Sequence, residues 1–274
     1  MTRLEKKLAA LKSAGRKGFF VYITAGTPTI DESFHAMIEA EKAGADVIEI
    51  GIPFSDPLAD GPVIQDSSVT ALRNGITLEK ILELSRKIRA QSEIPLIGMG
   101  YINNFMSYGY AGGSAPYDGF EKFIVDAKAA GIDGVIIPDV PHEESQQMRE
   151  ICKRHEVHLT EFITPETTPE RMKSTCASAS GFIYCVSNTG VTGVKKIDYS
   201  RINAKILEAR KFTDVPMAVG FGIGSGETAV QAAQNSDAVI VGSAVVKLLH
   251  EWQFNDAMNL IREIRTALDK NFGG

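Results

Sequence analysis

The most constraining feature of this chain is an alternation of short apolar segments with helical patterns, repeated eight times. The apolar segments are rich in β-branched residues and nearly continuous, which is typical of strands in a parallel sheet that helices cover on the outside. The predicted strands span 19–25, 47–52, 95–101, 133–138, 157–163, 181–187, 216–220 and 237–241. The predicted helices span 30–43, 77–91, 119–130, 143–155, 168–178, 199–211, 226–234 and 243–249, with flanking helices at 2–13 and 255–270.

Eight strand–helix units in 274 residues favour a closed (β/α)8 TIM barrel with an extra N-terminal helix over an open sheet. No linker or charge run divides the chain, so residues 1–274 are predicted to form a single domain. In such barrels the loops after the strands build the active site. The loops after the second, sixth, seventh and eighth predicted strands carry the Gly, Asp, Ser and Thr residues that such a site needs.

Bulk properties exclude several classes of protein. A net charge of −5 and a pI near 5.6 argue against nucleic acid or an anionic membrane as a partner. No apolar stretch approaches the roughly 20 residues that span a bilayer, and residues 1–15 lack the apolar centre of a signal peptide. The three cysteines lack the spacing of metal ligands, which predicts reduced thiols and a cytoplasmic protein.

Two carboxylates stand out. Glu49 interrupts the apolar run at 47–53, and strand alternation places it opposite Ile48 and Ile50, facing the barrel interior. Burial raises the pKa of a carboxyl group, which suits a proton donor and acceptor; alternatively, backbone donors or a buried hydroxyl satisfy Glu49. Asp60 lies in the Pro-rich loop 53–62, where it serves either chemistry or the turn itself. If Phe182 shares the inward face with Tyr184, the Tyr184 phenol would hydrogen-bond an inward carboxylate.

Three glycine-containing loops, at 187–194, 220–227 and 241–246, follow the late strands. Barrels often bind phosphate there through backbone N–H groups, although glycine is also the ordinary turn residue. No predicted strand carries a lysine, which argues against a Schiff base, and the five histidines form no cluster, which argues against a metal site. Acid–base chemistry on a small phosphorylated substrate remains. The side chains that would line a pocket for an aromatic ring, although these residues alone favour barrel core, are Tyr22, Ile64, Met99, Tyr101 and Phe221.

Five segments together resemble the α subunit of tryptophan synthase, in order and spacing along essentially the whole chain. They are EIGIPFSDPLADGPVIQ (49–65), PDVPHEES (138–145), YCVSNTGVTG (184–193), GFGI (220–223) and GSAVV (242–246). The resemblance implies retro-aldol cleavage of indole-3-glycerol phosphate to indole and glyceraldehyde 3-phosphate. It also implies that this chain carries no cofactor, that a PLP-bearing β subunit is its partner in an α2β2 heterotetramer, and that indole is channelled to that partner.

The resemblance also implies residue roles. Glu49 matches the acid–base carboxylate, Asp60 matches the carboxylate that holds the indole N–H, and Tyr184 matches the tyrosine beside the catalytic acid. The positions that match the phosphate cradle are Gly193, Gly222, Gly242 and Ser243, and those that match pocket walls are Tyr22, Met99 and Phe221. We expect the loops 53–62 and 187–196 to act as lids, with Asp60 meeting Thr192 when they close.

The chain departs from the family pattern at 108–120, where deleting AGGSAPY (111–117) would restore a family-like YGYDGF. In the family this loop faces the β subunit, so we expect the extra residues to weaken or alter partner binding. Three alternatives remain open: a stand-alone lyase, a mainly regulatory subunit for a β partner, and another phosphate-binding barrel. Both carboxylates argue against the second, and the absence of a strand-borne lysine argues against the third.

Overall fold

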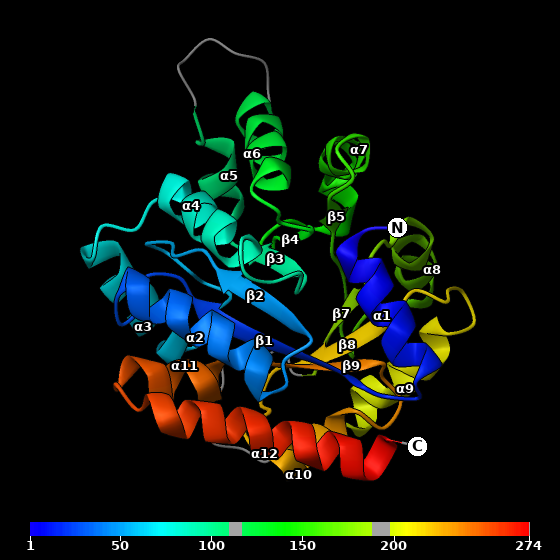
Figure 1. Ribbon diagram of the computed structural model, residues 1–274. Coiled ribbons are helices and arrows are strands. Elements are labelled where there is room, and N and C mark those ends of the chain that lie inside the picture. The colour runs from blue at the N-terminus through cyan, green and yellow to red at the C-terminus, as the bar shows by residue number, and fades with distance from the viewer. Residues whose placement is uncertain (110–116, 188–197, 274) are drawn as a thin grey trace.

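A computed structural model describes residues 1–109, 117–187 and 198–273 of the chain. Within these residues nine parallel strands form one sheet in the order β5-β4-β3-β2-β1-β9-β8-β7-β6. The strands are β1 (Gly18–Thr24), β2 (Val47–Gly51), β3 (Leu96–Met99), β4 (Gly134–Ile136), β5 (His158–Leu159), β6 (Glu161–Ile163), β7 (Ile183–Val186), β8 (Met217–Gly220) and β9 (Ala238–Val241). Figure 1 shows them enclosed by helices.

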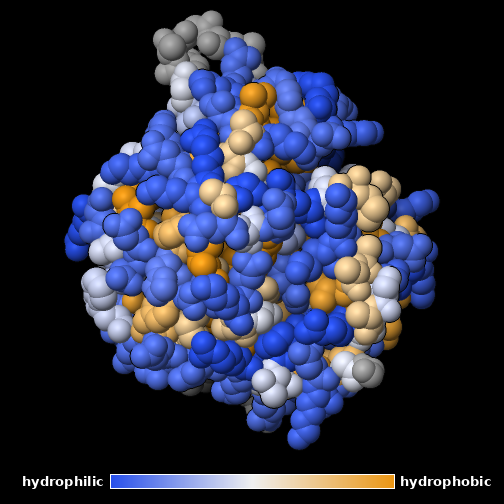
Figure 2. Space-filling model, in the orientation of Figure 1, coloured by the Kyte–Doolittle hydropathy of each residue, from blue (hydrophilic) through white to orange (hydrophobic). Residues whose placement is uncertain are grey.

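The helices follow the strands along the chain, so each crossover packs on the outside of the sheet (Figure 1). They are α1 (Arg3–Ser13), α2 (Ile30–Ala43), α3 (Pro62–Arg73), α4 (Leu78–Arg89), α5 (Ile102–Met106), α6 (Asp118–Ala129), η1 (His142–Glu144), α7 (Gln146–Arg154), α8 (Pro169–Ser178), α9 (Ser200–Ala209), α10 (Gly226–Ala232), α11 (Ser243–His250) and α12 (Phe254–Phe272). None of the helices in the described residues is long and apolar enough to cross a membrane. The face seen in Figure 2 is mostly hydrophilic, with scattered apolar residues.

One predicted strand, 157–163, forms two short pieces instead of one. The first piece, β5, pairs with β4, and the second, β6, pairs with β7. Thr160 lies between them, and its N–H still donates to the Val135 carbonyl at 3.0 Å. The first half of the segment therefore hydrogen-bonds to β4, and the second half hydrogen-bonds to β7. This completes the ring of eight predicted strands and confirms the TIM barrel.

Two helices were not predicted. α3 begins with Pro62, whose fixed backbone angle and missing N–H suit the first turn of a helix. Its inward side buries Ile64, Ser67, Ser68 and Ala71, and the two serines weaken the apolar pattern that would reveal it. α5 is a five-residue helix after β3, too short for a periodic signal.

Two separate apolar layers confirm the predicted alternation in β2. Ile48 and Ile50 belong to the cluster that packs against the outer helices, and Val47 belongs to the cluster inside the barrel. Glu49 shares the inward face with Val47 because side chains alternate along a strand. The sequence therefore places an ionisable group inside the barrel.

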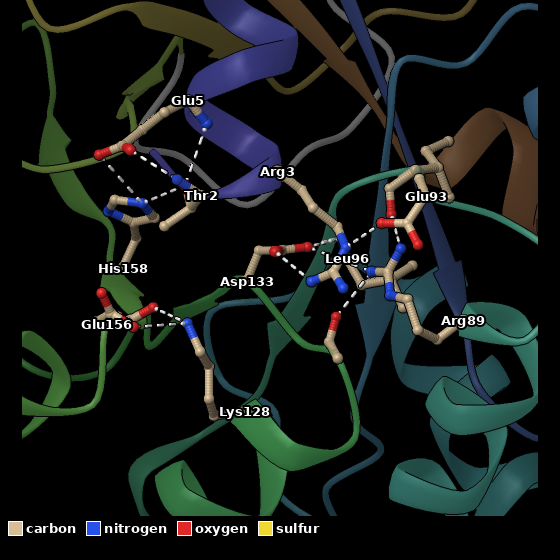
Figure 3. A network of polar contacts seen from close by, with 12 residues as sticks. Thr2, Arg3, Glu5, Arg89, Glu93, Leu96, Lys128, Asp133, Glu156 and His158 are labelled. Atoms are coloured by element: carbon tan, nitrogen blue, oxygen red, sulfur yellow. Dashed lines mark hydrogen bonds and ion pairs between the residues drawn. The ribbon is translucent and has the colours of Figure 1, made fainter.

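The N-terminal helix closes the end of the barrel at which the strands begin. Leu4 and Leu8 of α1 belong to the cluster inside the barrel. Figure 3 shows Arg3 between Glu93 and Asp133, with nitrogen–oxygen distances of 2.5 and 3.3 Å, and Thr2 beside His158, with Oγ1 3.0 Å from Nε2. These contacts fix α1 to the starts of β3, β4 and β5.

We predict that Leu4→Ala lowers the free energy of unfolding by about 2–4 kcal/mol, because Leu4 is fully buried and the truncation leaves a cavity. Urea denaturation measures this loss. Lys6→Ala, at an exposed position on the same helix, is the matched control and should change stability by no more than about 0.5 kcal/mol. Equal effects of the two substitutions would show that α1 does not close the barrel.

Candidate active site

Two adjoining cavities open where the strands end. The larger has a volume of about 550 Å³ and the smaller about 300 Å³. Both are lined by Asp60, Gly61, Met99, Tyr184 and Phe221. The smaller is also lined by Tyr22, Glu49, Ile64, Gly222, Gly242 and Ser243. Most of the residues singled out in the sequence therefore meet at one place.

Glu49 is a buried acid without a partner. Its side chain is 0% exposed, and neither carboxyl oxygen has a hydrogen-bond partner among the described residues. Loss of solvation raises its pKa to about 8, because an apolar surrounding disfavours the charged form. Glu49 is therefore protonated at neutral pH. The alternative in which backbone donors or a hydroxyl satisfy it is not realised in the described residues.

Tyr184 faces the interior but does not bond Glu49. Tyr184 and Phe182 both belong to the inner cluster, which confirms the shared face. The predicted hydrogen bond to an inward carboxylate is wrong for Glu49 because the phenol packs against β8: a Cβ on Gly220 would lie 2.1 Å from Tyr184 Oη. The rings of Phe162 and Phe221, 5.5 and 6.1 Å away between centroids, hold the phenol there. Burial, and then the charge of Glu49, raises the pKa of Tyr184 well above its usual value.

Asp60 is held by Tyr101. The Tyr101 hydroxyl donates to Asp60 Oδ2 at 3.0 Å and accepts from the Ala59 N–H at 2.9 Å. The Phe54 ring stacks on Tyr101 with centroids 5.2 Å apart. Burial raises the pKa of Asp60 to about 6, and the bond from Tyr101 opposes that rise. Tyr101 was predicted as a pocket wall, but it is not part of the wall of either cavity and instead orients Asp60.

The four other predicted pocket residues, Tyr22, Ile64, Met99 and Phe221, all line the smaller cavity. Tyr22 of β1 lies opposite Glu49 of β2 in the register of the two strands. Its ring lies against Gly51, where a Cβ would stand 2.2 Å from Tyr22 Oη, so a glycine is required there. These residues form an apolar and aromatic wall around the two carboxyl groups.

Unpaired backbone N–H groups gather at the other end of the smaller cavity. The N–H groups of Gly222 and Ile223 donate to no acceptor in the described parts of the chain. α11 begins at Ser243, and its N-cap Gly242 supplies no side-chain hydrogen bond. The first N–H groups of a helix lack intrahelical partners and attract anions. Among the described residues no lysine or arginine lines this cavity, so these residues would hold an anion through amides and the Ser243 hydroxyl.

Several predictions concern residues outside the described ranges. Thr192, Gly193, most of the loop 187–196 and most of the inserted segment 111–117 fall in this category. The predicted meeting of Asp60 and Thr192, the second lid and the effect of the insertion therefore stay predictions. The described residues contain no group of three or more His, Cys, Asp or Glu side chains suited to a metal ion.

Some cavity residues were missed in the sequence. Gly61, Ile223 and Gly224 stand inside the segments that drew attention, and each lines the smaller cavity. Ile240 of β9 lines it as well, and its inward direction follows from strand alternation. Asp139 and His142, both in the segment 138–145 singled out above, and the distant Arg171 line the larger cavity, although the sequence analysis gave none of them a role.

The chain is similar to known proteins over nearly its whole length. Residues 8–271 match the family model described as tryptophan synthase alpha chain. The tryptophan synthase alpha chain of Clostridium kluyveri is 39% identical over 274 residues, covering 98% of this chain and 100% of the relative. That of Caldanaerobacter subterraneus is 40% identical over 247 residues, with 90% of each chain covered.

Solved structures with similar sequences have the same fold. Tryptophan synthase subunit alpha from Legionella pneumophila superposes with a TM-score of 0.86 at 33% identity, covering 98% of this chain and 99% of that one. A structure from Aquifex aeolicus gives a TM-score of 0.88 at 37% identity, with 98% and 99% covered.

We predict that E49Q changes the pH dependence of stability. Between pH 4.5 and about 8 the unfolded chain ionises Glu49 while the folded chain keeps it protonated, so the folded state loses stability as pH rises. Glutamine does not titrate. From pH 5 to pH 8, E49Q should therefore gain about 3 kcal/mol relative to the parent. Chemical denaturation at several pH values measures this gain.

The matched control is Glu83→Gln at an exposed position of α4, which leaves Glu49 in place, so the loss of stability with rising pH that Glu49 causes should remain. Parallel stability curves for E49Q and the parent would show that Glu49 is not held protonated by the fold.

Proposed function

The chain belongs to the tryptophan synthase alpha chain family, and we propose that it cleaves indole-3-glycerol phosphate to indole and glyceraldehyde 3-phosphate. It would do so as the alpha subunit in tryptophan biosynthesis. The observation that carries the proposal is the buried Glu49, which has no hydrogen-bond partner among the described residues. It lines a cavity that also holds Asp60 and amides to which no described acceptor binds. The proposed reaction needs an acid that protonates indole C3, a carboxylate that accepts the indole N–H, and donors that bind the phosphate.

Glu49 would move both protons of the retro-aldol step. The neutral acid gives its proton to indole C3, and the resulting carboxylate removes the proton of the hydroxyl on the adjoining side-chain carbon. The bond between that carbon and C3 then breaks, which leaves indole and the aldehyde. The hydroxyl proton restores the acid, so the cycle balances without metal, Schiff base or cofactor. A pKa of about 8 suits a group that must both give and take a proton near neutrality.

Asp60 would stabilise the positive charge that develops on the ring when C3 is protonated. With a pKa of about 6 it is an anion at neutral pH, and its carboxylate would accept the indole N–H. Tyr101 occupies one of its oxygens, which keeps the carboxylate oriented before substrate arrives. Two carboxyl groups in different surroundings thus take different roles.

The phosphate would bind at the amide end of the smaller cavity, at Gly222, Gly242 and Ser243, with Gly193 completing the cradle. Tyr22, Ile64, Met99 and Phe221 would surround the indole and glycerol portions, with Tyr184 beside the acid. A hydrophobic wall expels water, and that strengthens the interactions of the two carboxyl groups.

The proposed partner is a PLP-bearing β subunit, in an α2β2 complex that receives indole directly. Channelling has a physical reason, because indole is small and apolar and would otherwise escape. We propose that the loops 53–62 and 187–196 close over substrate, with Asp60 meeting Thr192, and that residues 111–117 weaken or alter the contact with the partner.

We predict slow cleavage of indole-3-glycerol phosphate by the chain alone, a marked rise on adding a β subunit, and loss of activity in E49Q by at least about 10³-fold. Steady-state indole release measures all three. Turnover in the wild-type chain that the β subunit does not change would support a stand-alone lyase. Absence of turnover in both conditions, together with activation of the β subunit, would leave a regulatory role and refute the proposal.

We predict a bell-shaped profile of kcat/KM against pH. The free enzyme needs Asp60 ionised and Glu49 protonated, so activity should rise through about pH 6 and fall through about pH 8. Tyr101→Phe removes the hydrogen bond that favours the Asp60 anion, so its acidic limb should move to higher pH while its alkaline limb stays in place.

Tyr108→Phe is the matched control, because Tyr108 donates to Asp126, far from the cavity. A Tyr101→Phe profile with an unmoved acidic limb would contradict the role given to Tyr101.

A further inference from the structure

Two hydroxyl groups converge on one carbonyl oxygen beside the smaller cavity. Ser187 Oγ donates to the Phe221 carbonyl at 3.0 Å, and the Tyr199 hydroxyl donates to the same oxygen at 3.4 Å. The Ser187 N–H also donates to the preceding carbonyl, that of Gly220, at 3.3 Å. Ser187 therefore holds two successive carbonyl groups at the point where β8 ends.

The backbone at this point is unusual. Phe221 has a φ of 76°, and Gly222 follows with a φ of 72°. The left-handed region costs a bulky residue on the order of 1 kcal/mol or more and persists only where the surroundings enforce it. The two hydroxyl groups supply that enforcement, together with the packing of the Phe221 ring against Tyr184. Tyr199 and Ser187 are themselves buried.

The geometry of one peptide unit connects these hydroxyls to the cavity. The Phe221 carbonyl and the Gly222 N–H belong to the same planar trans peptide, so they point in opposite directions. Fixing the carbonyl toward Ser187 and Tyr199 therefore fixes the N–H on the opposite side. That N–H has no acceptor among the described residues, and Gly222 lines the smaller cavity.

We propose that Ser187 and Tyr199 are positioning residues that aim the Gly222 N–H at the phosphate of the substrate. This inference rests on the proposed function, because it assigns the phosphate to the amide end of the cavity. Neither hydroxyl touches the substrate. Each acts through the Phe221–Gly222 peptide, and Ser187 acts more strongly because its hydrogen bond is shorter.

Binding measurements separate this role from a general effect on folding. In Ser187→Ala, the dissociation constant for glycerol 3-phosphate should rise about tenfold, and that for inorganic phosphate should rise in the same direction. The dissociation constant for indole, which has no phosphate, should change by less than twofold. Tyr199→Phe should show the same selectivity with a smaller effect, and Ser187→Thr, which keeps the hydroxyl, should restore phosphate binding. Isothermal titration of the full chain measures each value.

Turnover gives a second readout. In Ser187→Ala the KM for indole-3-glycerol phosphate should rise about tenfold while kcat changes by less than threefold, because the proton-transfer groups are untouched. Equal weakening of indole and glycerol 3-phosphate, or a fall in kcat alone, would overturn the positioning role. If Ser187→Ala does not fold, Tyr199→Phe decides the same question.

The two proposals fail in distinguishable ways. A wild-type chain that binds glycerol 3-phosphate but cleaves no substrate would refute the proposed function. The binding measurements on the Ser187 and Tyr199 variants would then decide the positioning role. A wild-type chain that cleaves substrate, with variants that bind glycerol 3-phosphate normally, would refute the positioning role alone.

Discussion

The structure depends on closing a ring of hydrogen bonds. A parallel sheet buried on both faces leaves costly unpaired groups at any open edge, and here the segment 158–163 removes both edges by pairing with β4 through its first part and with β7 through its last. Closure brings the ends of all strands to one mouth. Residues from β1, β2, β7, β9, the loop after β8 and the start of α11 line one cavity only because the ring is complete.

Within that mouth, the two carboxyl groups differ because their surroundings differ. Glu49 rises from the middle of a strand into an apolar interior, where no described group satisfies it. Asp60 comes from a loop, remains half-buried and accepts the Tyr101 hydroxyl. The fold thus keeps one acid neutral and the other charged at the same pH, and no cation among the described residues contributes to either pKa. Burial of Glu49 lowers the free energy of unfolding, and the same burial makes the acid reactive.

Much of this arrangement follows from the sequence. The barrel and the inward direction of Glu49 were predictable because they depend on local signals. These signals are the uniformly apolar strands, the polar loops that follow them and the alternation of residues around Glu49. The split at Thr160 was not, because it depends on which neighbour each half of the strand meets. α3 was hidden by its buried serines. The role of Tyr101 and the packing of Tyr184 on Gly220 were also hidden, because both are contacts between distant segments.

The closure of the barrel floor by α1 has a consequence for the order in which the chain acquires its structure during synthesis. α1 leaves the ribosome before the residues that it packs against, which are Glu93, Asp133, His158 and Gly181. The amphipathic helix therefore stays undocked until the chain has been made as far as residue 181. Its polar face carries four lysines and arginines and a single acid between Arg3 and Ser13. These charges keep the helix hydrated before it packs. α1 is thus made before its partners and can pack only after they have formed.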